Sequence, residues 1–431
     1  MNITKTDSPD FKTQLIKIGN RGKLDNEKLR ATVKEIVDKV AAEGDKALFD
    51  YTEKFDGYKL TAGNIMLSEE DIEEAASRVG QKEWSILKLA ADRIEKFHAK
   101  QVIQSWSFED EPGIELGQRI LPLSRVGIYT PGGTAAYPST LLMAAIPAKI
   151  AGVGEIIIAT PTKGGKPHPL IAAAIKICGI KQVFKIGGAQ AIAALSYGTE
   201  SVPQVDKIVG PGNAYVTTAK QMIYGRTAID MIAAGPSEVV IIADGKADPA
   251  FAAADMLAQA EHDALAGAIL LTPDEAFARQ VADEIDRQLE DLPRKAFAGK
   301  ALTEFGAIIV TRNMDEAAQI ANDLAPEHLE LLLENPRQML EKIKNAGAVL
   351  LGYSTPAALG DYMAGPNHIL PTERSARFSS PLGVYDFIKR TSVISFDRMA
   401  LEKYGPQTAA FADMEGLSGH GKSISVRLSR K

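Results

Sequence analysis

The first hundred residues follow the helical period, with apolar positions recurring at intervals of three and four. Within residues 29–51, for example, Val33 and Ile36 fall on one face of an amphipathic helix. Residues 82–100 repeat the pattern, with the charges on the outer face. Residues 104–124 change to short alternating runs with turn residues, which predicts strands and a linker.

From Arg125 onward, short β-branched runs alternate with helical patterns. Continuous apolar strands joined by crossover helices predict parallel sheets covered on both faces, and thus an α/β fold. The strands are too many for one ordinary open sheet, so we expect two sheets in two α/β domains, divided near residues 127 and 235. No strand is expected beyond Gly352, and the last residues predict a helical tail that contains glycines.

Composition narrows the class of protein. At about 150 residues per domain, the 431 residues suffice for two or three domains. Hydrophobic residues make up 45% and charged residues 24%, which excludes a disordered or fibrous chain. The net charge of −6 disfavours nucleic acid or an anionic membrane as a partner. No apolar run predicts a membrane span or a signal peptide, so we expect a cytoplasmic enzyme.

Glycine-rich turns follow several predicted strands, at residues 132–133, 187–188 and 210–213. Backbone amides in such turns can reach a ligand phosphate, although each turn is also explained by a need for positive φ. None has the GxGxxG spacing of the common dinucleotide fingerprint. Three such turns in one α/β block favour a nucleotide crevice of an unusual kind.

Two pairs of neighbouring residues are candidates for metal binding and proton transfer. Gln259 and His262 are three apart in a predicted helix, so they share a face and could bind one divalent ion; the alternative is a surface placement. Glu327 and His328 follow Pro326, which predicts the first turn of a helix. At that position the helix dipole would keep the carboxylate ionised and the imidazole neutral, so that both side chains could accept protons. The alternative is that Glu327 is present only because the dipole favours an acidic residue there.

The second half of the chain holds further polar residues in glycine-rich surroundings. Asp361 and His368 lie in a predicted loop, as ligands or as turn residues, and Glu415 and His420 lie in the tail. The single cysteine, Cys178, lies in an apolar helix and is interpreted as a packing residue rather than a nucleophile. One cysteine also excludes an intramolecular disulfide and a CxxC metal site. His98, at the end of a charged helix, is expected to face solvent.

Taken together, these motifs resemble the histidinol dehydrogenase family over the whole chain. The matching segments are residues 125–133, 187–191, 209–215, 229–238, 258–262, 325–329, 365–368 and 415–420.

The resemblance implies a set of site residues. Zinc would be bound by Gln259, His262, Asp361 and His420, which are nitrogen and oxygen donors without a thiolate. NAD would lie near Tyr129, Gln190 and Asn213. The substrate would contact Ser237, His328, His368 and Glu415 together with the four zinc ligands.

The resemblance also implies a fold and an assembly. Two incomplete Rossmann-like α/β/α domains, one inserted in the other, would carry small helical arms at both ends. We expect an N-terminal arm at 1–26, a metal-binding and catalytic domain at 27–126 plus 237–381, and an inserted NAD-side domain at 127–236. Residues 382–431 would form a C-terminal arm that completes a site of the partner subunit in an intertwined homodimer.

The implied reaction takes L-histidinol, two NAD⁺ and water to L-histidine, with L-histidinal as the intermediate. His328 would act as base toward the alcohol and Glu327 toward the water that adds to the aldehyde. Because Cys178 is misplaced for a thiohemiacetal, a hydrated aldehyde is the expected intermediate. The alternatives are a dehydrogenase acting on another small amino alcohol or diol, a zinc hydrolase without NAD and, least favoured, a non-catalytic metal-binding protein.

Overall fold

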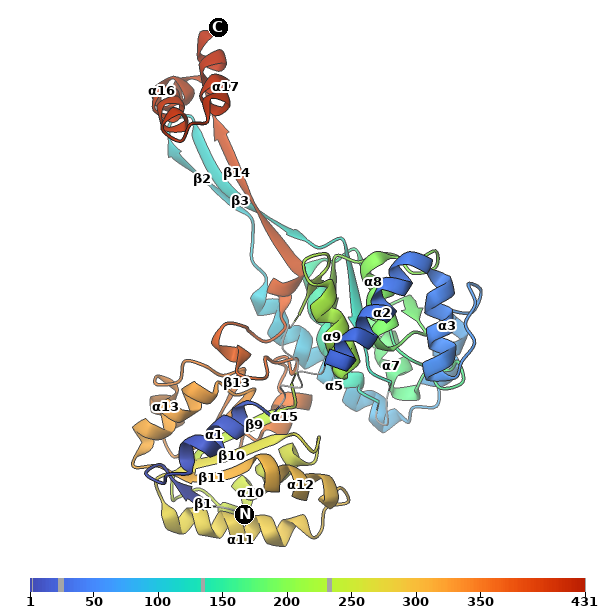
Figure 1. The fold of residues 1–431 in the computed structure, drawn as a ribbon, viewed down its shortest axis with the longest axis vertical. Helices are drawn as coiled ribbons and strands as arrows, with labels where there is room; N and C mark the ends of the chain where they lie inside the picture. Colours follow the sequence, from blue (N-terminus) through green and yellow to red (C-terminus); the bar gives the residue numbers. More distant parts are fainter. Residues whose placement is uncertain (2, 22–26, 133–135, 231–234, 431) are drawn as a thin grey trace. The chain divides into compact units, whose positions relative to one another are not determined.

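A computed structural model describes the chain except residues 2, 22–26, 133–135, 231–234 and 431. The chain divides into two compact units, drawn in Figure 1. The larger unit comprises Met1–Gln101 and Ser124–Phe387, and the smaller unit comprises Val102–Leu123 and Ile388–Lys431. Gly133 of the first glycine turn and residues 231–234 of the motif at 229–238 lie outside the described residues.

The larger unit contains two parallel sheets. The five-stranded sheet has the order β6-β5-β4-β7-β8 and the six-stranded sheet has the order β1-β11-β10-β9-β12-β13. Strands of the first are β4 (Arg125–Tyr129), β5 (Glu155–Ala159), β6 (Gln182–Phe184), β7 (Lys207–Val209) and β8 (Ala228–Ile229). Strands of the second are β1 (Ile3–Lys5), β9 (Glu238–Ala243), β10 (Gly267–Thr272), β11 (Gly306–Val310), β12 (His328–Leu332) and β13 (Ala348–Leu351).

Both sheets follow the same winding. Numbered along the chain from β4 or from β9, each has the strand order 3-2-1-4-5, which is the Rossmann order without its sixth strand. In the second sheet β1 adds an edge strand beside β11. The expectation of an α/β fold with two incomplete Rossmann-like sheets is thus confirmed. Such sheets bind ligands where the winding reverses, here between β4 and β7 and between β9 and β12.

Helices cover both faces of the six-stranded sheet (Figure 1). On one face lie α10 (Pro249–Ala260), α11 (Glu275–Leu289) and α12 (Lys295–Phe305), and on the other lie α1 (Phe11–Gly19), α13 (Met314–Leu324) and α14 (Pro336–Leu340). The strands alternate between the two clusters. In β12, Leu332 packs on the α10 side, whereas Leu329 and Leu331 pack on the α13 side. Residues 328 and 330 therefore face α10.

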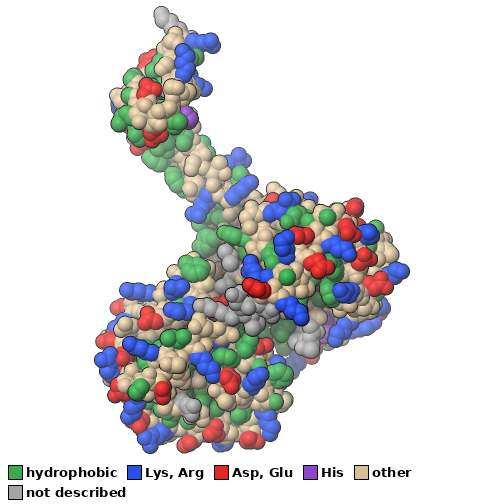
Figure 2. Space-filling view, in the orientation of Figure 1, with side chains coloured by type: hydrophobic (Ala, Val, Ile, Leu, Met, Phe, Trp, Pro, Cys, Tyr) green, Lys and Arg blue, Asp and Glu red, His purple; other side chains and the backbone are tan. Residues whose placement is uncertain are grey.

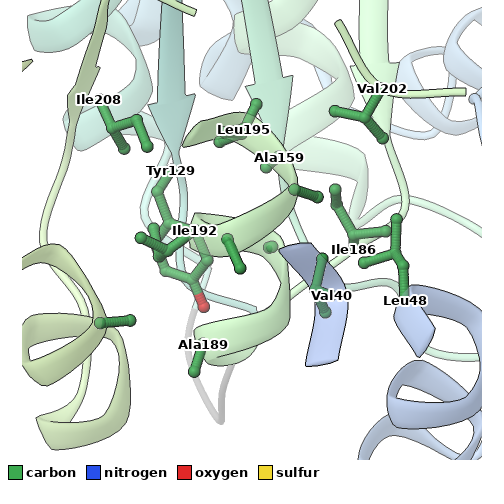
Figure 3. Close-up of a cluster of buried hydrophobic side chains, with 14 of the residues drawn as sticks. Val40, Leu48, Tyr129, Ala159, Ile186, Ala189, Ile192, Leu195, Val202 and Ile208 are labelled. Carbon is green, nitrogen blue, oxygen red and sulfur yellow. The ribbon is translucent and has the colours of Figure 1, made fainter. Parts of the chain in front are cut away.

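The N-terminal helices pack with the five-stranded sheet. Figure 3 shows Val40 of α2 and Leu48 of α3 beside Ile186, in one buried cluster that also contains Ile192 and Leu195 of α8 and strand residues such as Ile208. The helices around this sheet are α2 (Glu27–Glu43), α3 (Asp45–Asp56), α4 (Glu69–Ala76), α5 (Gln81–His98), α6 (Pro138–Ala151), α7 (Pro169–Cys178), α8 (Gly188–Tyr197) and α9 (Ala214–Ile223).

This packing differs from the grouping of 27–126 with 237–381 that we expected. The apolar face of α2 contacts α8 and α9, so the N-terminal helices are buried with the inserted block. Residues 102–123 belong instead with the C-terminal segment. Sequence periodicity shows that a helix has an apolar face but does not show which sheet that face covers.

The smaller unit is an antiparallel sheet with two helices. Its strands are β2 (Trp106–Glu111), β3 (Ile114–Pro122) and β14 (Ile388–Phe396), in the order β14-β3-β2, and its helices are α16 (Arg398–Met414) and α17 (Ser418–Ser429). The prediction of strands in residues 104–124 is confirmed, whereas the expectation of no strand beyond Gly352 is wrong. Large apolar side chains remain exposed here, among them Trp106, Ile394, Phe411 and Met414.

The remaining elements are short. They are α15 (Ala357–Tyr362) and the 3₁₀ turns η1 (Ala99–Gln101), η2 (Ser375–Arg377) and η3 (Val384–Phe387). Among the described residues, no helix is long and apolar enough to cross a bilayer. Figure 2 shows basic and acidic side chains interspersed over the visible face of the α/β sheets and their helices, without a field of one sign.

Candidate active site

A cavity of about 390 Å³ in the larger unit gathers most of the candidate residues. One wall follows the carboxyl ends of β4 and β7, with Pro131, Gly210 and Asn213. The opposite wall lies where β9 and β12 begin, with Ser237 and His328. The first wall is the usual ligand position of a doubly wound sheet, whereas the second presents side chains from the amino edge of its sheet. The cavity is also lined by Gln259, His262, Glu327, Asp361 and His368.

Glu327 and His328 lie at the start of strand β12, not in the first turn of a helix. β12 pairs in parallel with β9 and β13, and all of its residues are buried. An apolar run of this length fits a buried strand as well as a buried helix, and here pairing on both sides produces the strand. The helix-dipole argument for the protonation of these two side chains is therefore wrong.

Glu327 is fixed by reciprocal hydrogen bonds with Glu238, the first residue of β9. The Glu238 N–H donates to Glu327 Oε2 at 3.1 Å, and the Glu327 N–H donates to Glu238 Oε1 at 3.2 Å. Arg21 forms a buried ion pair with the other oxygen of Glu238. Burial raises the pKa of Glu327 to about 7, against the lowering effect of His328 and with support from the charge of Glu238. Glu327 therefore titrates near neutral pH, where a general base is most effective.

His328 is paired with a candidate metal ligand. Its Nε2 lies 3.2 Å from Asp361 Oδ1, and its Nδ1 lies 3.9 Å from Glu327 Oε2. Burial lowers the pKa of His328, but the hydrogen bond to Asp361 and the charges of Glu327 and Asp361 outweigh it and raise the pKa to about 9. The charge of Asp361 thus favours the protonated imidazole where no cation offsets it, whereas the sequence predicted a neutral ring.

His368 lies at the same cavity and is held by two ring contacts. Its Nε2 is 3.1 Å from Thr140 Oγ1 on α6, and its Nδ1 is 3.0 Å from the backbone oxygen of Asp361. Burial lowers the pKa of His368. In the neutral ring, Nδ1–H donates to the Asp361 carbonyl and Nε2 accepts from the Thr140 hydroxyl, so these contacts fix both the tautomer and the orientation of the imidazole.

Three of the four candidate zinc ligands come together. Gln259 is the penultimate residue of α10, His262 lies two residues after the helix ends, and Asp361 lies in α15; all three line the cavity. Burial opposes the ionisation of Asp361, but the hydrogen bond and charge of His328, with smaller contributions from His368 and His262, lower its pKa. Gln259 Nε2 is buried without a hydrogen-bond partner among the described residues. Amide, imidazole and carboxylate donors suit zinc, so these residues fit the ion.

The set is incomplete within the larger unit. The described residues contain no group of three or more His, Cys, Asp or Glu side chains able to hold a metal ion. Of the four proposed ligands, the larger unit supplies Gln259, His262 and Asp361. His420 lies in α17 and Glu415 at the end of α16, both exposed and both in the smaller unit.

The residues expected near NAD divide into two groups. Asn213 lines the cavity and caps α9 by accepting hydrogen bonds from the amides of the next turn. Tyr129 and Gln190 are buried away from the cavity lining. The Tyr129 hydroxyl accepts a hydrogen bond from the Gly188 N–H at 3.1 Å, and burial raises its pKa to about 12. Tyr129 therefore supports the glycine turn at 187–188 from behind.

The glycine turn at 210–213 is fixed by a buried ion pair that the sequence interpretation missed. Lys220 Nζ donates to the Gly210 carbonyl at 2.7 Å, the Gly210 N–H donates to Asp230 Oδ2 at 2.6 Å, and Lys220 pairs with Asp230. Gly210 has φ +110°, and a Cβ there would lie 2.1 Å from the Tyr129 carbonyl. Only glycine fits at this position.

Cys178 behaves as predicted. Its side chain is 2% exposed in the core, and burial raises the pKa of the thiol to about 12. It does not line the cavity. His98, by contrast, is fully buried, with Nδ1 2.8 Å from Gln101 Oε1, so its expected exposure is wrong.

Replacing Cys178 with Ala is expected to leave kcat and KM within about twofold of the wild type, because a neutral buried thiol cannot serve as a nucleophile. The small cavity should lower the melting temperature modestly. Kinetics on alcohol and aldehyde substrates test this expectation. A selective loss of aldehyde oxidation would show that the thiol takes part in the chemistry.

Comparison with known proteins identifies the family of the chain. The family model for histidinol dehydrogenase matches residues 19–428. A histidinol dehydrogenase of Syntrophotalea carbinolica is 49% identical over 99% of this chain and 99% of its own, and one of Nitrosospira multiformis is 51% identical over 94% and 92%. The crystal structure of histidinol dehydrogenase from Elizabethkingia anophelis superposes with a TM-score of 0.93 at 39% identity, covering 99% of this chain and 98% of that chain. On sequence and fold together, this chain belongs to the histidinol dehydrogenase family.

Proposed function

We propose that this oxidoreductase of histidine biosynthesis converts L-histidinol to L-histidine in two NAD-linked oxidations, through L-histidinal, with one zinc ion per subunit. One observation carries the proposal. The cavity places a base of pKa about 7 and the three donors Gln259, His262 and Asp361 opposite a glycine-turn wall suited to a nucleotide.

Zinc bound by Gln259, His262, Asp361 and a fourth ligand would orient the amine and imidazole of histidinol and offset the charge of Asp361 beside His328. NAD⁺, bound along the glycine turns near Asn213, would accept the hydride in each oxidation. Tyr129 and Gln190 would act from behind, by shaping the turn at 187–188.

The two ionisable residues divide the proton transfers. His328, in its neutral form, accepts the hydroxyl proton as the alcohol becomes the aldehyde. Glu327 accepts a proton from the water that adds to the aldehyde, and the hydrate formed is the substrate of the second oxidation. Ser237 and His368 lie on the cavity wall, where they contact the substrate. The buried Glu238 contact holds the Glu327 carboxylate in place throughout.

The fourth ligand is proposed to be His420 of the second chain in a homodimer, with Glu415 contacting the substrate. Three observations support a shared site. The described residues hold no group of three or more His, Cys, Asp or Glu side chains that could bind a metal ion, His420 is exposed, and the smaller unit exposes large apolar side chains. The enzyme would act in the cytoplasm on small molecules, without nucleic acid or membrane as partners.

The stoichiometry of the reaction tests the proposed function. With L-histidinol as the limiting substrate, two NADH are expected for each histidinol consumed, measured by absorbance against chromatographic quantification of histidine. One NADH with accumulated aldehyde would contradict the four-electron reaction. Turnover of an ester or amide without NADH would favour a zinc hydrolase, and a faster reaction with another amino alcohol would change the substrate.

Replacing His262 with Ala is expected to abolish tight zinc binding and most activity. The side chain is exposed at the end of α10, so the fold should persist. Zinc per chain, measured by atomic spectroscopy after dialysis, should fall from one to near zero, with an unchanged circular dichroism spectrum. Equal zinc in wild type and variant would remove His262 from the ligand set.

A further inference from the structure

Glu330 is a fully buried carboxyl group that the proposed chemistry does not use. It lies on β12 two residues after His328 and is 0% exposed. Because strand side chains alternate, Glu330 and His328 face the same side, toward α10. Its Oε1 accepts a hydrogen bond of 2.7 Å from the N–H of Ala357, the first residue of α15.

The second oxygen of Glu330, Oε2, is buried and has no hydrogen-bond donor among the described residues. The carboxyl group of Asp255, on α10, lies within hydrogen-bonding reach of the Glu330 carboxyl group. Two carboxyl groups can share such a bond only if one carries a proton. Burial and the charge of Asp255 raise the pKa of Glu330, which places the proton on Glu330 and leaves Asp255 as the acceptor.

These contacts join the three elements that carry the candidate machinery. Asp255 lies one helical turn before Gln259 on α10, Glu330 shares β12 with His328, and Ala357 begins the short helix that contains Asp361. One neutral carboxyl group therefore connects α10, β12 and α15 behind the cavity. A helix as short as α15 has little stability of its own, so an external contact is needed to fix it.

We propose that Glu330 is a positioning residue of the metal site: its buried carboxyl group links Asp255 and the Ala357 amide, and so sets Gln259 and Asp361 at the spacing that zinc requires beside His328. The inference rests on the proposed function. Glu330 does not line the cavity and touches no substrate. It acts on the zinc ligands through the elements that bear them, as supporting residues of metal sites commonly do.

The test uses the full-length protein stripped of metal, and zinc alone as the probe. Zinc affinity is measured by competition with a chromophoric chelator in wild type and in E330Q, E330L and D255A. The amide of E330Q can donate to Asp255 and accept from Ala357, so its affinity and kcat are expected within about threefold of wild type. E330L keeps the volume but loses both contacts, and a roughly tenfold to hundredfold weaker zinc affinity is expected.

The D255A variant keeps the test informative if E330L fails to fold. Asp255 is only half-buried, and alanine is favourable in a helix, so D255A should fold while losing the same bond. L331A is the matched control: Leu331 is buried on the opposite face of β12, so this variant loses stability without touching the two contacts of Glu330. Its zinc affinity is expected to equal that of wild type despite a lower melting temperature.

The outcomes separate the two proposals. If wild type binds zinc and forms NADH but E330L and D255A bind zinc equally well, the positioning role is overturned and the proposed function stands. An E330Q variant as impaired as E330L, or an L331A variant as impaired as either, would also overturn the positioning role. Failure of wild type itself to bind zinc would overturn the proposed function and this inference with it.

Discussion

Replacing Glu327 with Gln is expected to lower the rate of L-histidinal oxidation by on the order of a hundredfold or more, the usual contribution of a general base. The amide cannot accept the proton of the attacking water. It can still accept the Glu238 N–H bond that holds Glu327 Oε2, so the strand and the cavity should persist. Zinc content should remain at the wild-type level, because Glu327 is not among the proposed ligands.

The pH dependence gives a second readout for the same variant. Burial raises the pKa of Glu327 to about 7, and a base works only when deprotonated. The wild-type rate with aldehyde supplied directly should therefore rise as the pH increases through 7 and level off above it. In E327Q this rise should disappear, since the group that titrates has been removed.

A matched control is available on the same segment. Glu334 follows β12 and is exposed, where it pairs with Lys246. E334Q changes the same functional group but should leave the rate and its pH profile unaltered. Normal aldehyde turnover by E327Q would remove Glu327 from the hydration step. A loss equal in E327Q and E334Q would point to a general effect of charge.

The architecture could largely be predicted from the sequence, because the pattern of apolar residues within each short segment indicates whether it forms a strand or a helix. Alternation of apolar strands with crossover helices predicts parallel sheets, and the structure has two, each with the Rossmann order short of one strand. The partner of each apolar face is not local information. The face of α2 that contains Val33 could cover either sheet, and only packing assigns it to α8 and α9.

The candidate site likewise has features that the sequence predicts and features that only the packing of the fold reveals. The sequence motifs identify Gln259, His262 and Asp361, and the structure gathers them at one cavity. The error lay in the secondary structure after Pro326, where a short apolar run fits both a strand and a helix. In a helix, the side chains of residues 328 and 330 would point in different directions, whereas in a strand they lie on the same face. The wrong period therefore hid the shared face of His328 and Glu330.

Other supporting residues could be found only in three dimensions. Arg21 and Glu238 are separated by more than two hundred positions in the sequence, yet their buried ion pair lies directly behind Glu327. Lys220 and Asp230 likewise both contact Gly210 of the glycine turn at 210–213, although both come after this turn in the sequence. No spacing rule connects such pairs, because each is created by the packing of separate elements.

The second large effect concerns assembly. Chains with His262→Ala or His420→Ala are each expected to be inactive alone, and to recover about a quarter of wild-type activity when refolded together in equal amounts. If the site takes His262 from one chain and His420 from the other, a mixed dimer has one complete site and one that lacks both histidines. Random pairing makes half of the dimers mixed, and half of their sites are complete.

A second mixture tests the same assignment in the opposite direction. Wild type combined with the double variant H262A/H420A has complete sites only in wild-type homodimers if sites are shared, which gives about a quarter of full activity. If each chain completes its own site, every wild-type chain stays active and the mixture gives about half. The first mixture then stays inactive. Inactivity of the single-variant mixture, after native mass spectrometry has verified heterodimers, would exclude the shared site. The exposed apolar side chains of the smaller unit, such as Trp106 and Met414, would then require another explanation.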